Sequence, residues 1–192
     1  LLQDAGVQAS VIDVDAFALH NAFEFNYPGA QEGIVALVNV GHETTNVNIL
    51  ENGVPILTRD IPFGSRRLRE DLQRERGLTA EQAEDVVQAR EIETDLEQFV
   101  EASADEVAVG IERASAFLMT REDGETLGRI FLSGGGARIP GMVEALGRRM
   151  NVETGLVNPF ERVPVGPDAT TEFSIDEAAP MLLLPLGLAL RQ

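Results

Sequence analysis

Two short polar stretches contain the residue types that could bind an anion, and each directly follows an apolar run. The first, residues 41–46, reads GHETTN and places a glycine beside hydroxyls and backbone N–H groups, which together can form an anion-binding nest. The second, residues 134–138, reads GGGAR, and its glycines allow a flat or anionic ligand to approach the backbone before a helix. Each stretch by itself is more typical of an ordinary turn, so ligand binding and a purely structural turn both stay open.

The amino-acid composition excludes several other chemistries. All 15 basic residues are Arg, and a chain without Lys has neither the P-loop lysine nor a Schiff-base lysine. A chain without Cys forms no disulfide, thiolate nucleophile or Cys-ligated zinc site. His20 and His42 are the two histidines, and their wide separation in the sequence argues against a histidine-built metal site.

The charge of the chain bears on its partners. Its 192 residues carry a formal net charge of -17, which repels nucleic acid and anionic lipid, so we expect neither as a direct partner. The most apolar run, residues 179–192, is too short to cross a bilayer, and we expect a closing helix there rather than membrane insertion. Because residues 1–14 look like a helix end, a glycine stop and a strand without an initiator Met, we expect the chain to begin inside a larger protein.

The first half of the sequence must position the 41–46 stretch. Asn52-Gly53 between two alternating runs is a strong hairpin signal. Ser65 stands where a helix N-cap is expected, and the spacing of Thr79 and Gln82 predicts a capping box. The expected elements are strands at 8–14, 34–40, 45–51 and 54–61, and helices at 15–24, from 65 to Gly77 and from 79.

The second half must position the 134–138 stretch. A helical spacing of apolar residues predicts a long amphipathic helix over 91–120, broken near Ser103. A turn at 122–125, a strand at 129–134, a helix opened by Pro140, a strand at 153–158 and a final helix from about Ile175 follow. A meander of strands followed by alternating helices and strands predicts an α/β fold, a mixed sheet flanked by helices.

At these residues the sequence resembles the actin-like ATPase superfamily, and within it most closely the PilM family of type IV pilus assembly proteins and the related FtsA family. The segment VNVGHETTNVNILENGVPILTRDIPFGSRRL is similar to a PilM segment that reads D-I-G-x-x-T-T-N, a hairpin and R-x-I-P-F-G-G. LSGGGARIPGM resembles the adenosine motif, and VNPFERV and GLALR also match PilM sequences. The resemblance implies an actin-like, ribonuclease H-like lobe.

By this resemblance, ATP with Mg²⁺ is held in a cleft between two lobes. The 41–46 stretch is then the second phosphate loop, the glycine triplet holds adenosine, and Asp15 takes the place of an acidic residue that orients water or hydrated Mg²⁺. Asp15 also fits a helix N-cap, and that alternative stays open. The nucleotide-binding residues implied are Gly41, His42, Glu43, Thr44, Thr45, Asn46, Glu84, Gly134, Gly135, Gly136 and Arg138.

The sequence also departs from the family pattern. Asn39 replaces the acidic residue that holds Mg²⁺ through water, so we expect weaker metal binding at that position. Ser65 replaces the second glycine after P-F-G, and the lysine that accompanies Glu84 in the family is missing. No first phosphate loop is found, so we expect about one lobe and the linking helix. The expected division is 1–30 for the end of the first lobe and the linking helix, 31–175 for the second lobe with a reduced helical insertion around 78–122, and 176–192 for a helix packing back at the lobe junction.

The resemblance implies a cytoplasmic scaffold of type IV pilus biogenesis and twitching motility, peripheral to the inner membrane through its partners. In that family the partner is the N-terminal peptide of the inner-membrane protein PilN, whose groove is built largely from first-lobe parts. We expect weak ATPase activity or none. The alternatives are a filament-forming, self-associating FtsA-like ATPase, which would carry a basic amphipathic membrane helix, and a nucleotide-free scaffold of the same fold.

Overall fold

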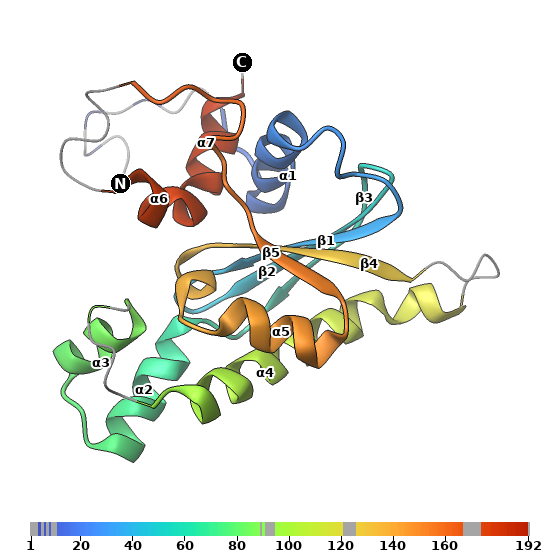
Figure 1. Cartoon of the computed structure of the whole chain (residues 1–192). Coiled ribbons are helices and arrows are strands. Elements are labelled where there is room, and N and C mark those ends of the chain that lie inside the picture. Colours follow the sequence, from blue (N-terminus) through green and yellow to red (C-terminus); the bar gives the residue numbers. More distant parts are fainter. Residues whose placement is uncertain are drawn as a thin grey trace.

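The architecture centres on a mixed sheet with helices on both faces (Figure 1). The computed structural model describes residues 4, 6, 8, 11–88, 90, 95–120, 126–166 and 174–191. Within them five strands lie in the order β3-β2-β1-β4-β5, and this confirms the predicted fold class. The strands are β1 Ile34–Val40, β2 Thr45–Glu51, β3 Val54–Ile61, β4 Leu127–Ser133 and β5 Glu153–Leu156. β1, β2 and β3 form an antiparallel meander, whereas β4 runs parallel to β1 and β5 parallel to β4.

The central strand β1 is apolar along most of its length because both of its faces are covered. Its even-numbered residues, among them Val38 and Val40, belong to the larger core, and Val35 and Leu37 belong to the smaller core on the other face. Since side chains alternate along a strand, Asn39 points to the same face as Leu37. The first polar residue of the strand therefore lies on the face with the smaller core.

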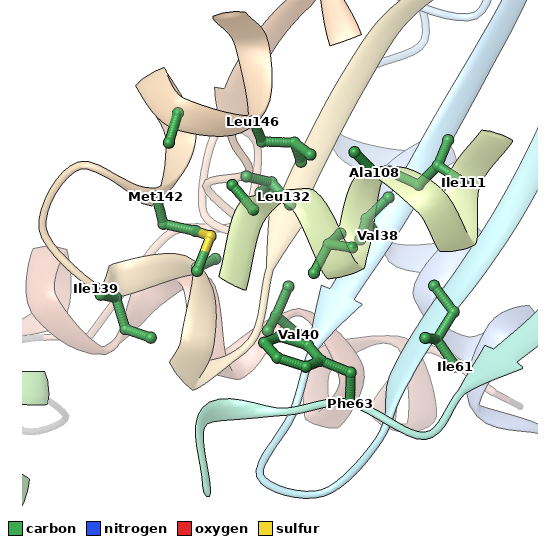
Figure 2. Packing of buried hydrophobic residues seen from close by; sticks show 14 of the residues in the cluster. Val38, Val40, Ile61, Phe63, Ala108, Ile111, Leu132, Ile139, Met142 and Leu146 are labelled. Carbon is green, nitrogen blue, oxygen red and sulfur yellow. The ribbon is translucent and has the colours of Figure 1, made fainter. Parts of the chain in front are cut away.

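The larger core lies between the sheet and the helices α4 (Glu97–Ser115) and α5 (Met142–Met150) (Figure 1). Figure 2 shows Phe63 close to Val40, at the end of β1, with Ile111 of α4 and Leu146 of α5 in the same cluster. Two further helices, α2 (Ser65–Arg76) and α3 (Ala80–Val87), continue this layer beyond the strand ends.

The opposite face carries α1 (Asp15–Asn26) and α7 (Leu183–Ala189), which pack against each other (Figure 1). A Cβ on Gly187 of α7 would lie 1.8 Å from the carbonyl oxygen of Ala18 in α1, so only glycine permits this crossing. Before α7 the chain forms α6 (Ile175–Ala178) and the 3₁₀ turn η4 (Ala179–Leu182). None of the helices in the described part of the chain combines the length and apolarity needed to cross a membrane.

Local signals in the sequence explain the best-predicted elements. The strands at 34–40, 45–51 and 54–61 have the predicted bounds, and Asn52 and Gly53 both have the positive φ that the hairpin turn requires. The imidazole of His20 in α1 lies 2.8 Å from the carbonyl oxygen of Gly53, which ties the hairpin to the helix. The capping box of Thr79 and Gln82 is present as predicted.

Two predictions near the N-terminal ends of elements are wrong. The predicted strand at 8–14 is not formed at residues 11–14, and Ile12 is 93% exposed. A strand needs a neighbouring strand, and the described residues supply none here. Residues 9 and 10 lie outside the described part. Ser65 is the first residue of α2, and Gly64 occupies the N-cap position without a side-chain cap. The N–H groups of Ser65 and Arg66 donate instead to the carbonyls of Gly41 and His42.

The second half departs from prediction at its helix boundaries. α4 runs unbroken through Ser103 and continues as the 3₁₀ turn η1 (Ala116–Thr120), whereas residues 91–94 and the turn at 122–125 lie outside the described residues. Pro140 precedes α5, whose N-cap is Gly141 at φ +84°. The expected single C-terminal helix is divided into α6, η4 and α7, and Pro180 begins the break because it has no N–H to donate.

Candidate functional site

The two polar stretches found in the sequence meet at one edge of the sheet. β1 and β4 are parallel neighbours, so their carboxyl ends lie together, and Asn39 is the register partner of Ser133. The chain after β4 turns at Gly134 into the 3₁₀ helix η2 (Gly135–Arg138). The N–H of Gly134 donates to the carbonyl of Pro180 at 2.7 Å, which brings η4 to the same edge.

A row of polar side chains crosses four strands just inside this edge. Ser133 Oγ donates to Asn39 Oδ1 at 3.3 Å, and Asn39 Nδ2 donates to Asn46 Oδ1 at 3.2 Å. Asn46 Nδ2 in turn donates to Asp60 Oδ1 at 2.7 Å. Asn39 is therefore both acceptor and donor, a combination that an amide provides and an ionised carboxylate does not. Sequence reasoning found Asn39 and Asn46 but missed Ser133 and Asp60, because strand register is a long-range property.

The 41–44 turn is held by a backbone hydrogen bond of its own and by close packing against Gly64, just before α2. The N–H of Gly41 donates to the carbonyl of Thr44 at 3.1 Å, and a Cβ on Gly64 would lie 2.4 Å from the carbonyl oxygen of His42. Thr45 is buried, and its hydroxyl donates to the carbonyl of Phe63 at 2.8 Å. Thr44, in contrast, is exposed, and its hydroxyl makes no hydrogen bond within the described structure. Of the two threonines, Thr44 is the one available to a ligand.

The two charged side chains of the turn are engaged with α2. Glu43 pairs with Arg66 at 2.5 Å, and Arg66 also pairs with Glu70 at 2.7 Å. His42 contacts the guanidinium of Arg69, which also pairs with Glu84 of α3. Burial by itself would raise the pKa of the Glu84 carboxyl, but hydrogen bonds from Gln88 and Arg69 outweigh it and hold that pKa below its ordinary value. Glu84 is therefore ionised at neutral pH.

A cavity of about 310 Å³ adjoins the same edge and brings together three predicted site residues, Glu84, Gly135 and Arg138. The guanidinium of Arg138 makes no ion pair within the described structure, and its Nη1 contacts Met181 Sδ at 3.9 Å. Val87 and Met181 supply apolar wall. The other lining residues are Ser65, Gln88, Arg90, Ser174, Glu177 and Ala178. Sequence reasoning missed the part of this wall that comes from η4 and α6, because these segments carry no recognisable motif.

The three glycines of the 134–138 stretch differ in their surroundings. A Cβ on Gly134 would lie 2.4 Å from the carbonyl oxygen of Val40, and one on Gly136 would lie 2.3 Å from Val40 Cγ1. A Cβ on Gly135 would meet only Met181 Sδ at 3.9 Å. Gly134 and Gly136 are therefore needed for packing against β1, and Gly135 is the glycine that leaves open space at the cavity.

Asp15 and Asn39 are the two residues that the sequence suggested for contact with water or Mg²⁺. Asp15 is exposed at the start of α1, where Val14 occupies the N-cap position without a side-chain cap, and no described hydrogen bond or ion pair joins Asp15 to residues 41–46. Asn39 has amide and hydroxyl neighbours in the polar row. No group of three or more His, Asp or Glu side chains that could hold a metal ion occurs among the described residues.

Comparison with solved structures identifies the class of fold. The chain is similar to the PilM-PilN type IV pilus biogenesis complex, with 24% identity, a TM-score of 0.82 and coverage of 99% of this chain and 55% of that one. It is also similar to MreB5 of Spiroplasma citri bound to AMPPNP, with 11% identity, a TM-score of 0.64 and coverage of 97% and 60%. For Ta0583, an archaeal actin homologue, these values are 15%, 0.59, 92% and 54%. The fold is that of the actin-like proteins.

The family follows from the sequence. The family model described as type IV pilus assembly protein PilM matches residues 1–192. The chain therefore belongs to the PilM family, and the resemblance seen in its motifs is confirmed. It spans between 54% and 60% of the length of the three solved chains.

Proposed function

We propose that this chain supplies the second, nucleotide-binding lobe of an actin-like scaffold in type IV pilus biogenesis. The observation that carries the proposal is the cavity beside the β1 and β4 ends, where Gly135 leaves open space and the Arg138 guanidinium makes no ion pair within the described structure. An unpaired cation beside an apolar wall suits a ligand that combines a flat ring with negative charge.

The residues present fit ATP at this edge. Val87 and Met181 would cover the adenine, and Arg138 would face the ribose and phosphates. Thr44 has the exposed hydroxyl of the 41–46 turn and would contact the terminal phosphates together with backbone N–H groups. Mg²⁺ fits less well: Asn39 supplies no charge and its amide is already bonded to Asn46, so the ion would be held largely by the phosphates and water. We therefore expect weak ATP hydrolysis at most.

We propose the partner because the chain belongs to the PilM family. The solved relative is a PilM-PilN complex, and we propose that the protein holds the N-terminal peptide of a PilN-type inner-membrane protein on the cytoplasmic side. The division into a linking segment at 1–30, a lobe at 31–175 and a returning C-terminal segment at 176–192, which contains α7, belongs to the same proposal. A filament-forming ATPase is the less favoured function, because the polar row has an amide where strong metal-assisted turnover would need a carboxylate.

A thermal-shift series on the full-length protein tests the nucleotide part. Saturating ATP or ADP should raise the unfolding temperature, since ligand at about 100 times its Kd stabilises by about 2.7 kcal/mol. Arg138→Ala should abolish most of the shift, whereas the control Arg113→Ala, at an exposed position on α4, should retain it. If neither nucleotide stabilises the protein, it is a nucleotide-free scaffold and the nucleotide part is wrong.

A separate titration tests the partner part. A labelled peptide with the N-terminal sequence of the PilN-type protein should bind saturably to the full-length protein, as measured by fluorescence anisotropy, and a scrambled peptide of the same composition should not. Failure of the native peptide to bind would reject the partner and would leave the nucleotide result standing.

A further inference from the structure

A second cavity, of about 370 Å³, lies between α2 and α4 beneath the 41–44 turn. His42 and Glu43 line it from the turn, Phe63 lines it from the segment after β3, and Ser103 and Glu106 line it from α4. Its volume lies within the range of about 300–1,000 Å³ typical of ligand pockets. It includes His42 and Glu43 of the 41–46 turn but shares no lining residue with the cavity that contains Glu84, Gly135 and Arg138.

Ser103 is the first sign that this cavity binds something. The residue is 5% exposed, yet its hydroxyl makes no hydrogen bond within the described structure. No buried side-chain oxygen or nitrogen in the described part is fully enclosed without a partner, so the Ser103 hydroxyl opens into the cavity it lines. A buried hydroxyl is normally hydrogen-bonded, and this one offers a donor and an acceptor to a ligand.

The charges around the cavity indicate the sign of the ligand. Four carboxylates and two guanidinium groups line it. Arg66 is paired with Glu43 and Glu70, and its guanidinium is already neutralised. Arg67 is paired with Asp71 at 3.3 Å, and Asp71 is also paired with Arg74 at 2.5 Å. Glu106 has no ion pair or hydrogen bond within the described structure. The surplus charge is therefore negative, and the unpaired group is a carboxylate.

We propose that this cavity binds a basic side chain, arginine or lysine, from an extended segment of a partner protein. The cationic end would pair with the Glu106 carboxylate, and the Ser103 hydroxyl would accept one of its hydrogen bonds. The aliphatic stem would lie on Phe63, as long basic side chains commonly cover apolar surface. A net charge of -17 on the whole chain attracts basic segments toward it. This proposal does not depend on nucleotide binding.

Amide chemical shifts of the isotope-labelled chain test the proposal with a short arginine-containing peptide as the probe. Its citrulline counterpart has nearly the same shape without the charge. The arginine peptide should shift the resonances of His42, Ser103 and Glu106, and the citrulline peptide should not. Glu106→Gln should weaken binding about fivefold, as for loss of one partly exposed charge pair. Ser103→Ala should weaken it about twofold to fivefold.

The controls separate this site from general attraction to an acidic protein. Glu24→Gln removes an exposed carboxylate from α1 and should leave the affinity unchanged. Equal shifts with both peptides, shifts spread over other acidic surfaces, or no effect of Glu106→Gln would each overturn the proposal. Inorganic phosphate that shifted the same three resonances while the arginine peptide did not would show an anion site instead and would also overturn it.

Discussion

The side-chain amide of Asn39 donates to Oδ1 of Asn46, its register partner on β2, at 3.2 Å. Asn46 Nδ2 donates in turn to Asp60 Oδ1, so the row of hydrogen bonds ends at a carboxylate. A second carboxylate at position 39 could not donate to Asn46 and would add a negative charge to the row. The amide at this position is therefore matched to its neighbours on the sheet.

Asn39→Asp should lower the free energy of unfolding by about 1 kcal/mol, the typical net value of a hydrogen bond. Urea unfolding measures it. The double variant Asn39→Asp with Asp60→Asn keeps the number of carboxylates in the row constant and should recover part of the loss.

The same Asn39→Asp variant should also raise the Mg²⁺ dependence of nucleotide affinity, because it adds a negative charge at this position. An unchanged dependence would show that our account of Asn39 is wrong.

Thr45 and Thr44 form a matched pair with opposite expected effects. Thr45→Val removes the hydroxyl that bonds the Phe63 carbonyl in the interior and should cost about 1–3 kcal/mol of unfolding free energy. Thr44→Val changes an exposed hydroxyl and should leave stability nearly unchanged while it weakens nucleotide binding. Thermal unfolding and nucleotide titration of both variants check this pair, and equal destabilisation by the two would contradict it.

The glycine triplet gives a second matched pair. Gly134→Ala places a Cβ against the Val40 carbonyl at φ +86° and should destabilise the fold by about 1–3 kcal/mol. Gly135→Ala meets open space and should change stability by less than about 0.5 kcal/mol. Denaturant unfolding measures both effects, because a shift of the midpoint at unchanged slope reports a change in stability. A Gly134→Ala variant as stable as the parent would remove the packing explanation for this glycine.

The ion pair between Asp13 and Arg191 predicts a pH dependence. A hydrogen bond from Arg191 holds the pKa of the Asp13 carboxyl below its ordinary value. Because the folded-state pKa is depressed, the pair stabilises the fold above the ordinary aspartate pKa and is lost as the pH falls through the folded-state pKa. Asp13→Asn should lower the unfolding temperature at neutral pH, and the difference from the parent should vanish in strong acid. For comparison, Glu24→Gln should show little difference at either pH.

Local signals made much of the fold predictable. The hairpin at Asn52-Gly53, the capping box at Thr79 and the apolar β1 strand are all encoded within a few residues, so the turn, the start of the helix and the bounds of the strand followed from the sequence. The errors arose where distant groups decide. Ser65 is not the cap because the Gly41 and His42 carbonyls already accept from the N-terminal N–H groups of α2. A strand at 11–14 has no described neighbour with which to pair.

The site was predictable in outline and not in detail. The sequence order located the turn at 41–46 and the glycines at 134–136, and the parallel pairing of β1 with β4 brings them together. The separate surroundings of Gly134 and Gly135, and of Thr44 and Thr45, depend on packing against residues far along the chain. The wall from Ser174 to Met181 has no sequence signature, because its position depends on one backbone hydrogen bond from Gly134 to Pro180.

The close crossing of Gly187 and Ala18 has a mechanical consequence. With backbone in direct contact, α1 and α7 cannot slide along each other without a collision, and the Asp13–Arg191 pair holds the same two segments at their ends. The helices α1 and α7 therefore form one unit on this face of the sheet. A force applied to one of the two helices is transmitted to the other, and we expect the two helices to move together.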